Sequence, residues 1–471
     1  MRNPVDRREF LRAGAFAAVG CEAGMAATSL ATPGLAASNP TAPRAAPPTA
    51  ALGRDATHFG VTPGAPDDQT KALQRAIDET ARERVPLALP PGVYRAAMLT
   101  LPDGARLVGV RGATRLVFAG GPSFVAASRC DSVSLTGLTI DGAGASLPER
   151  RGLVHIEHGR AIAVRDCDIL ASGRCGIWIE DVAGDIGDCA FTDIAATAIV
   201  CFDAAGLTIA RNTIRRAGDN GIEVLRHQRG DDGTLIVDNR VENVANRSGG
   251  SGQYGNAINV FRGANVIVRG NRIRDCAYSA VRGNSASNIQ IVGNTVTAAR
   301  EVALYAEFAF EGAVIANNLV EGAATGVSVA NFNEGGRIAA VTGNIIRDLY
   351  PKSPAGTPPD NDAGVGIYVE ADTTVSGNVI ENAPGFGIIA GWGKYLRDVA
   401  ITGNVVRKAF VGIGVSVAPE AGTALVSGNV IAECPRGAIV GLDHARPVTP
   451  DLSMPGAAKF PQIAIGTNRV G

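Results

Sequence analysis

A short unit built on asparagine recurs along most of the chain and limits the folds open to it. The unit is asparagine, any residue, then an aliphatic residue, and it begins at Asn212, Asn239, Asn271, Asn294, Asn318, Asn344, Asn378, Asn404 and Asn429. A second unit, a small residue followed by an aliphatic one, alternates with it at intervals of mostly about 21–26 residues. Repeats of this length predict a solenoid in which each repeat contacts only its neighbours. Leucine-rich repeats have a similar period, but their leucine signature is absent.

The alternation of side chains in the second unit indicates that each repeat is one coil of a parallel β-helix. An aliphatic residue always follows the small residue, in the column Val154, Ile177, Ile199, Ile222, Ile258, Val281, Leu304, Val327, Ile367, Ile388, Ile413 and Ile439. The position two residues later is apolar or small throughout. Alternation with period two places both columns inside, in coils stacked about 4.8 Å apart. We therefore expect an all-β fold, a single parallel β-helix of about twelve coils.

The asparagine column has a structural explanation. Asparagine tolerates the left-handed backbone of a sharp corner, and stacked amides hydrogen-bond from coil to coil. Cys167 and Cys189 occupy the same column one coil apart, which leaves a disulfide between them open. Of the eight cysteines only Cys21 lies near the N-terminus, and no Cys-x-x-Cys pair occurs. This pattern argues against a disulfide scaffold and against a zinc site.

The N-terminus has the pattern of an export signal. Arg7-Arg8-Glu9-Phe10-Leu11 matches the twin-arginine motif, and a weakly hydrophobic stretch rich in alanine and glycine follows it. Such signals are addresses read by a receptor and are excluded from the fold. We expect a twin-arginine signal peptide over residues 1–37, with lipidation at Cys21 as the alternative to cleavage after Ala37. The expected export partner is the twin-arginine translocase, and the expected location is the periplasm or the outside of the cell.

Three further segments complete the expected organisation. Residues 38–53 are rich in proline and alanine and predict a spacer before a β-helix domain over residues 54–471. Residues 67–84 predict a capping helix whose apolar face is formed by Ala72, Leu73, Ala76 and Ile77. At the other end, prolines disfavour strands, so residues 443–471 are expected to form a C-terminal cap; these prolines are Pro447, Pro450, Pro455 and Pro461.

Composition excludes several classes of partner. The 44 basic and 45 acidic residues give a net charge of −1, which argues against a nucleic-acid-binding surface. After residue 36 no run of apolar residues is long enough to span a membrane. We expect no cofactor and no metal. Asp360-Asn361-Asp362 resembles the start of a calcium loop, but the rest of that motif is missing.

The start of the domain resembles that of pectin-lyase-like β-helix proteins. The resemblance rests on the Gly-Asn-x-Ile coils and on three short runs, Phe59-Gly-Val-Thr, Asp67-Asp-Gln-Thr and Leu89-Pro-Pro-Gly-Val-Tyr. It implies a right-handed parallel β-helix. With the export signal, nearly the whole chain resembles a family of twin-arginine-translocated repeat proteins from alphaproteobacteria. That resemblance implies the fold and the export route, and it implies no particular activity.

Catalytic motifs known from this fold are mostly missing. Asp219-Asn220-Gly221-Ile222 matches the Asp-Asp element of polygalacturonases only in part, and His158-Gly159 lacks the first glycine of their Gly-His-Gly motif. Their Arg-Ile-Lys motif and the Asp-Pro-His motif of alginate epimerases do not occur. These departures argue against polygalacturonase and epimerase chemistry. The fold alone also hosts lyases, hydrolases and passive binders.

Residues at outward positions of the same strands are of the kinds that stack on sugars or hydrogen-bond to them. The candidate substrate-binding residues are Tyr305, Asn284, Asn259, Glu223, Tyr368 and Trp178. Insertions at residues 245–255 and 350–363 both enter just before this strand, so we expect them to wall a groove over the middle of the face. We expect these outward side chains to face solvent.

Two classes of function remain open. The first is a polysaccharide hydrolase or lyase in which Glu307 and Glu370, two coils and about 9.6 Å apart, act as general acid and base. Arg282 is the third catalytic candidate, because with Tyr305 it would orient the sugar or stabilise an enolate. The second class is a non-catalytic glycan-binding or structural protein of the cell envelope that uses the same face. Substrate identity and oligomeric state are open at this stage.

Overall fold

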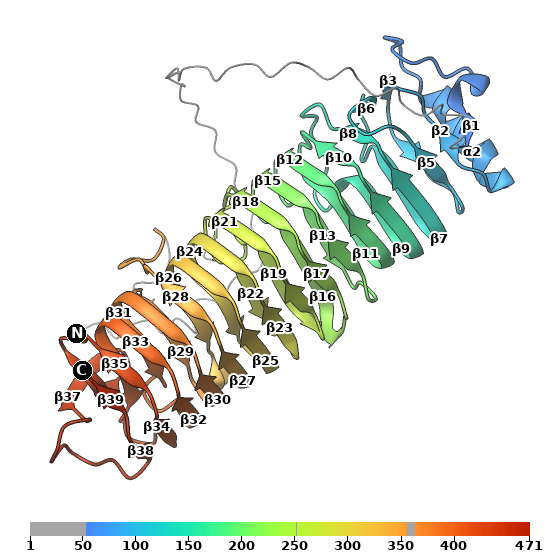
Figure 1. Cartoon of the computed structure of the whole chain (residues 1–471). Coiled ribbons are helices and arrows are strands. Elements are labelled where there is room, and N and C mark those ends of the chain that lie inside the picture. Colours follow the sequence, from blue (N-terminus) through green and yellow to red (C-terminus); the bar gives the residue numbers. More distant parts are fainter. Residues whose placement is uncertain (1–52, 251, 356–362) are drawn as a thin grey trace, which may run out of the picture.

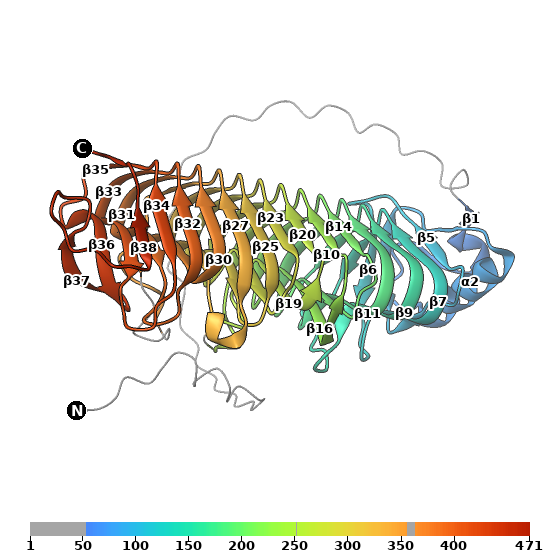
Figure 2. The ribbon, with the colours of Figure 1, turned by 90° about the horizontal axis from the view of Figure 1, so that it is seen from below.

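The structure is a computed structural model that describes residues 53–250, 252–355 and 363–471, and these form an elongated solenoid (Figure 1). The chain winds through about 14 coils, and strands of successive coils pair in parallel. Helix α2 (Thr70–Glu83) lies at one end of the solenoid and the C-terminal strands lie at the other (Figure 2). The expected parallel β-helix is confirmed. It has more than the expected twelve coils because regular strands already pair before Leu153.

The strands form three parallel sheets along the solenoid, and the longest strands bend from one sheet into the next. Sheet I contains β4 (Leu99–Thr100), β7 (Val125–Thr136), β9 (Gly152–Arg165), β11 (Cys175–Gly187), β13 (Ile199–Phe202), β16 (Ile222–Asp231), β19 (Ile258–Ala264), β22 (Val281–Asn284), β24 (Thr295–Glu307), β26 (Leu319–Val329), β29 (Val365–Val369), β31 (Val379–Ala390), β33 (Val405–Ser416) and β36 (Gly437–Asp443). Sheet II adds β1 (Arg54–Asp55), β2 (Leu87–Ala88), β5 (Arg106–Val108), β14 (Thr208–Ala210), β17 (Leu235–Val237), β20 (Ile267–Arg269), β23 (Ile289–Val292), β25 (Glu311–Ala316), β27 (Arg337–Thr342), β30 (Ala371–Ser376), β32 (Arg397–Thr402), β34 (Ala424–Ser427) and β38 (Ile463–Ile465). Sheet III adds β3 (Gly92–Ala96), β6 (Thr114–Phe118), β8 (Thr139–Asp141), β10 (Asp168–Leu170), β12 (Ala190–Ile194), β15 (Thr213–Ala217), β18 (Arg240–Val244), β21 (Arg272–Cys276), β28 (Ile345–Arg347), β35 (Val430–Ala432) and β39 (Arg469–Val470).

The inward column of sheet I is continuous and in register. Val154 pairs with Ile177, and the same column passes strand by strand to Ile439. All twelve predicted members are fully buried. The predicted inside and outside assignment of sheet I is therefore confirmed, because a slip by one residue would have exposed this column.

The asparagine column forms a continuous hydrogen-bonded ladder at the corner between sheets II and III. In a typical rung, Asn318 Nδ2 donates to Asn344 Oδ1 and to Ile291 O, both at 2.9 Å. Asn318 Oδ1 accepts from the backbone N and from Nδ2 of Asn294. The ladder runs from Asn212 to Asn429 and ends on Asn468. Coil-to-coil bonding by these asparagines, predicted from the repeat, is confirmed.

Cys167 and Cys189 precede this ladder as free thiols. Cys189 N donates to Asn212 Oδ1, so the cysteine backbone continues the ladder even though its side chain cannot. The two sulfurs donate to backbone carbonyls instead of bonding to each other. The seven cysteines in the described part of the chain are all free, so the disulfide left open above is not formed.

The capping helix covers the N-terminal end but is shorter than predicted. It begins at Thr70 instead of Asp67, because Asp68 forms a β-bridge with Arg95 and its side chain accepts from Thr70 N. Leu73, Ala76 and Ile77 are buried against the first coils, as predicted, while Ala72 is only half-buried.

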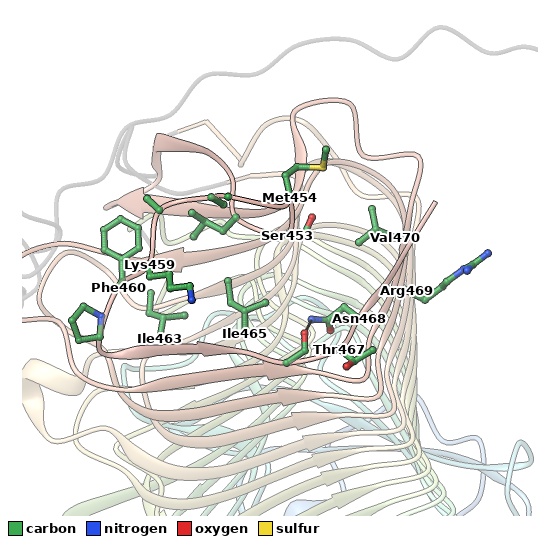
Figure 3. A pocket seen from close by; sticks show the side chains of 16 residues that line it. Ser453, Met454, Lys459, Phe460, Ile463, Ile465, Thr467, Asn468, Arg469 and Val470 are labelled. Carbon is green, nitrogen blue, oxygen red and sulfur yellow. Dashed lines mark hydrogen bonds between the residues drawn. The ribbon is translucent and has the colours of Figure 1, made fainter.

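The C-terminal segment contains more strand than predicted. β37 (Arg446–Asp451) pairs antiparallel with β36 and includes Pro447 and Pro450, which an edge strand tolerates. β38 and β39 then extend sheets II and III. Beside them lies a cavity of about 910 Å³, and Figure 3 shows Phe460, Ile463 and Ile465 among its lining side chains. Within the described residues, no helix has the length and apolar character needed to cross a membrane.

Candidate functional site

The predicted face is the outer surface of sheet I, and two rows of side chains cross it. The outer row runs from His155 through Trp178, Val200, Glu223, Asn259, Arg282, Tyr305, Ser328 and Tyr368 to Val440. The flanking row, two residues later on each strand, starts with Glu157, Glu180, Phe202, Leu225, Phe261, Asn284 and Glu307. Both rows have the predicted register. The face therefore brings Glu223, Asn259, Arg282 and Tyr305 onto four successive strands.

Solvent exposure of these side chains is where the prediction fails. Trp178, Glu223, Asn259, Arg282, Tyr305, Glu307 and Glu370 are all buried, and only Asn284 and Tyr368 are partly exposed. Side chains stacked about 4.8 Å apart leave little room for water between them, and the adjacent row covers them from the side. Alternation along a strand gives the direction of a side chain, but it does not show what lies above it.

Arg282 and Glu307 form a buried ion pair. Arg282 Nε donates to Glu307 Oε1 at 2.6 Å, and the two side chains are 6% and 1% exposed. Asn284 Nδ2 donates to the same carboxylate oxygen at 3.1 Å. The guanidinium lies 5.5 Å from the ring centroid of Tyr305. Glu307 is thus tied into a network that stabilises the face, and it is not the exposed carboxylate that the sequence predicted.

The insertion at residues 245–255 lies over this network, where the sequence predicted one wall of a groove. Arg282 Nη1 donates to Gly252 O, and Asn220 Nδ2 donates to Gln253 O. Gly252 has φ +138°, and a Cβ there would lie 1.9 Å from Arg282 Nη1, so the close approach requires glycine. Asp219 holds the base of the insertion by accepting from Ser248 N and Oγ. Half of the second insertion, residues 356–362 with the Asp360–Asp362 run, lies outside the described residues.

Glu223 and Asn259 lie at the edge of the network, on β16 and β19. Glu223 Oε1 accepts from Asn220 Nδ2 at 2.7 Å. Burial raises the pKa of Glu223 to about 7, even though hydrogen bonds from Asn220 and Thr197 oppose the shift. Within the described part of the chain, the Asn259 amide has no hydrogen-bond partner. A carboxyl group that titrates near neutral pH is a common property of proton-transfer and binding sites.

Glu370, Tyr368 and Trp178 belong to other parts of the face. Glu370 accepts from Phe332 N and from the Tyr368 hydroxyl, and Ser328 and Ala330 separate this pair from Tyr305 and Glu307. On the other side, Val200 separates Trp178 from Glu223. The Trp178 ring stacks on Phe202 with centroids 5.5 Å apart. The predicted catalytic pair Glu307 and Glu370 therefore consists of two carboxylates that are both buried and both already hydrogen-bonded.

A second group of polar residues, at the N-terminal end of the face, was missed. Burial holds the pKa of the His155 imidazole below its ordinary value, which favours the neutral form. Its Nε2 then donates to Glu157 Oε1 at 2.7 Å, while Nδ1 is buried without a partner. This bond holds the pKa of Glu157 below its ordinary value, and Arg151 Nη1 donates to the same oxygen at 3.3 Å.

Glu180 pairs with Glu157 on the next strand, and both are partly exposed. The Glu180 carboxylate has no hydrogen-bond partner among the described residues. The signal available in the sequence was a histidine two positions before a glutamate on one outward face, followed one coil later by a second glutamate in register. The described residues contain no group of three or more His, Cys, Asp or Glu side chains placed to hold a metal ion.

Comparison with known proteins supports the fold. Among solved structures, the N-terminal fragment of bacteriophage phi29 gene product 12 is 16% identical, with a TM-score of 0.54 over 88% of this chain and 74% of that one. The A-module of mannuronan C-5 epimerase AlgE4 from Azotobacter vinelandii is 16% identical, with a TM-score of 0.43 over 79% of this chain and 100% of that one. PfbA, a surface adhesin of Streptococcus pneumoniae, is 14% identical, with a TM-score of 0.47 over 88% and 99%. At 16% identity, the match to the phi29 fragment shows the fold alone.

At the level of sequence families, the model of the right-handed beta helix region matches residues 123–252 and 227–406, which together make up more than half of the chain. No curated protein matches the sequence. The match covers the coils that carry the face described above. The chain belongs to the right-handed β-helix family.

Proposed function

We propose that the protein is an exported glycoside hydrolase that cleaves a polysaccharide lying along the outer face of sheet I. The observation that carries this proposal is the pair Glu157 and Glu180, at paired positions of adjacent strands and both partly exposed. Paired positions lie about 4.8 Å apart. Retaining glycosidases place their two carboxyl groups about 5–5.5 Å apart. The spacing therefore favours cleavage with retention of configuration.

The surroundings of the two carboxyl groups assign their roles. Hydrogen bonds from His155 and Arg151 keep Glu157 ionised, which suits a nucleophile. Glu180, on the adjacent strand and without such bonds, takes the role of general acid and base. His155 acts through Glu157 and is therefore a positioning residue. Trp178, two residues before Glu180 on the same strand, is buried and packs on Phe202, so it helps to fix the strand that positions Glu180.

The reaction follows in two steps. A carboxylate oxygen of Glu157 forms a bond to the anomeric carbon, the glycosidic C–O bond breaks, and Glu180 gives its proton to the leaving oxygen. Water then attacks the anomeric carbon, Glu180 takes a proton from that water, and the bond to Glu157 breaks. Both carboxyl groups return to their starting forms. Arg282, Glu307 and Glu370 hold the rest of the face in place, and Glu223, Asn259, Asn284, Tyr305 and Tyr368 border the path of the glycan.

The test is release of reducing ends from a panel of neutral and acidic polysaccharides. Glu157→Gln and Glu180→Gln should each lower kcat by at least about 10²-fold. Glu420→Gln changes a carboxylate that is 77% exposed, and it should leave the rate unchanged. Proton NMR of the first product should show the anomer of the substrate. Full activity in both active-site variants would contradict the proposal, and unsaturated products would indicate a lyase instead.

A non-catalytic glycan-binding protein is the second candidate. It is favoured by the internal hydrogen bonding of Glu307 and Glu370, which leaves the middle of the face suited to contact rather than to chemistry. Binding to a glycan array without turnover of any bound glycan would support it. In that case Glu180→Gln would have no kinetic effect to measure. Phe202→Ala, at a partly exposed ring paired with Glu180, would weaken binding.

The export route and the wider family are part of the same proposal. Arg7 and Arg8 followed by Phe10 and Leu11 support twin-arginine export to the periplasm or beyond, and the repeats support membership of the twin-arginine-translocated repeat family of alphaproteobacteria. Replacing both arginines with lysine should retain the protein in the cytoplasm, as measured by cell fractionation. Unchanged export of that variant would contradict the route.

A further inference from the structure

Glu223 and Asn259 have hydrogen-bonding capacity that the protein itself does not use. They occupy paired positions on β16 and β19 and are only 9% and 7% exposed. The Asn259 amide, which has two donors and an acceptor, has no partner among the described residues. The enclosed, unpaired side-chain atoms among the described residues do not include those of Asn259, so its amide reaches the surface of the face and can meet a ligand that supplies the missing bonds.

The charges around this pair disfavour a charged ligand. Asp219 acts on Glu223, and Glu301 acts on Arg282. The positive charge of Arg282 is already matched by Glu307. The net charge of the side chains around Glu223 and Asn259 is therefore negative, and it would repel a uronate or a sulfate. An ammonium group would have to lose most of its hydration to reach side chains this deeply buried.

A neutral amide fits the same groups. Asn259 can accept from an amide N–H and donate to an amide carbonyl, and the acid form of Glu223 can donate to that carbonyl as well. Leu225, partly exposed and two residues after Glu223 on β16, offers an apolar contact. A sugar hydroxyl would use fewer of these bonds and would leave the apolar contact empty.

We propose that Glu223 and Asn259 form a subsite for the acetamido group of an N-acetylated amino sugar. The subsite lies three strands from the Glu157–Glu180 pair, about 14 Å along the solenoid at the usual strand spacing. The inference rests on the proposed function, because it assumes a glycan that runs along the face. It adds the chemical identity of one unit of that glycan, several sugars away from the bond that is cleaved.

Calorimetric titration of the full-length Glu180→Gln protein, which binds without turnover, tests the subsite. The probes are the β-1,4-linked hexamers of N-acetylglucosamine and of glucose, which share a backbone and differ in the acetamido group. The acetylated hexamer should bind at least about tenfold more tightly. Adding Asn259→Ala, or Asn259→Ser as a second variant, should remove the preference. Adding Asn333→Ala, at an exposed asparagine in η4 (Phe332–Glu334), should keep it.

The pH dependence of binding gives a second readout. Asp219, Tyr254, Cys175 and Cys201 are the titratable groups whose charges act with that of Glu223, and the acid form of Glu223 is the one that donates to the ligand. Affinity for the acetylated hexamer should therefore fall as the pH rises through about 7. Glu223→Gln stays neutral at every pH, so it should keep its affinity up to pH 8.

The outcomes separate this inference from the proposed function. Equal affinity for the two hexamers, or an unchanged preference in folded Asn259 variants, would overturn the acetamido subsite alone if glycan cleavage still depends on Glu157 and Glu180. Failure of both hexamers to bind, together with no cleavage of any glycan, would overturn both proposals. Thermal melts of each variant establish that it is folded.

Discussion

The asparagine ladder and the outer row of sheet I are both lines of buried polar side chains that cross the coils. In the ladder every rung repeats the same two donors and one acceptor, so each amide is satisfied by the next, as between Asn294 and Asn318. In the outer row the type of side chain changes at each strand, so neighbouring side chains do not supply all of one another's hydrogen bonds. His155 Nδ1 and the Asn259 amide are left without partners in the described part of the chain. Identical side chains in successive coils satisfy one another's hydrogen bonds. Side chains that differ from coil to coil leave donors and acceptors that a ligand can use.

The largest expected effect comes from the buried ion pair between Arg282 of the outer row and Glu307 of the flanking row. Arg282→Met leaves Glu307 as a buried charge without its partner, which should lower the free energy of unfolding by about 3–5 kcal/mol. The double variant Arg282→Met/Glu307→Leu should regain most of that loss, because neither charge then remains. Urea unfolding of the three proteins measures this. A loss below about 0.5 kcal/mol for Arg282→Met would mean that the pair is open to solvent.

Glu223 gives the next largest effect, through pH. Its folded pKa is raised from 4.5 to about 7, so its contribution to stability is fully present below pH 4.5 and is lost as the pH rises through 7. The shift corresponds to about 3 kcal/mol in all, most of which is lost between pH 5 and pH 8. Glu223→Gln should lack this part of the pH dependence. Parallel unfolding curves at pH 5 and pH 8 for the two proteins measure the difference, and identical pH dependence would contradict the burial of this carboxyl group.

Breaking the ladder should cost somewhat less. Asn318→Ala removes the acceptor for two donors of Asn294 and the donor for Ile291 O, all of them buried. A loss of about 2 kcal/mol or more is expected, since each unmet buried group costs about 1–3 kcal/mol and neighbouring groups can relax. Asn333→Ala is the control, at an exposed asparagine outside the ladder. Equal unfolding midpoints for these two variants would show that the ladder adds nothing to stability.

Asn259→Ala should have the smallest effect on stability. It would thereby separate the outer row more clearly from the asparagine ladder. Because the Asn259 amide bonds to nothing in the described structure, its removal should change the free energy of unfolding by less than about 0.5 kcal/mol. Asn259 and Asn318 are both buried asparagines in stacked coils, so the pair forms a matched comparison of a ligand-facing and a structural amide. A large loss for Asn259→Ala would place it among the structural residues.

Features that recur in every coil were predicted from the sequence, whereas contacts that occur only once were missed. Inward columns, the asparagine bonds and the register of both outer rows followed from the spacing, because one coil fixes the next. The burial of Glu307 did not follow, since it depends on Arg282 bending toward the flanking row and on Gly252 lying above it. The pair Glu157 and Glu180 was present in the predicted register. In the sequence only the histidine two positions before Glu157 distinguished this pair from other outward glutamates, and the hydrogen bond between His155 and Glu157 is visible only in the structure.

The start of α2 shows the same limit on a smaller scale. Asp67 and Asp68 have the composition of a helix N-terminus, and local preference alone extends the helix to them. The bridge between Asp68 and Arg95 is a contact between segments 27 residues apart in the chain, as is the bond from Ala97 N to Thr70 Oγ1. Tertiary pairing of this kind overrides propensity at the ends of elements.

The uniform ladder also bears on how chains of this kind can change in length over evolution. A coil lost or duplicated between two asparagines leaves every remaining rung chemically the same, so the rod can shorten or grow in whole units. Such changes are best tolerated from β31 to β36, where the outer row consists of Ile389, Gly414 and Val440 and packs as a plain apolar strip. Between β9 and β24 the same event would shift one carboxylate, amide or guanidinium relative to the rest. The number of coils can therefore change in evolution without changing the polar side chains between β9 and β24.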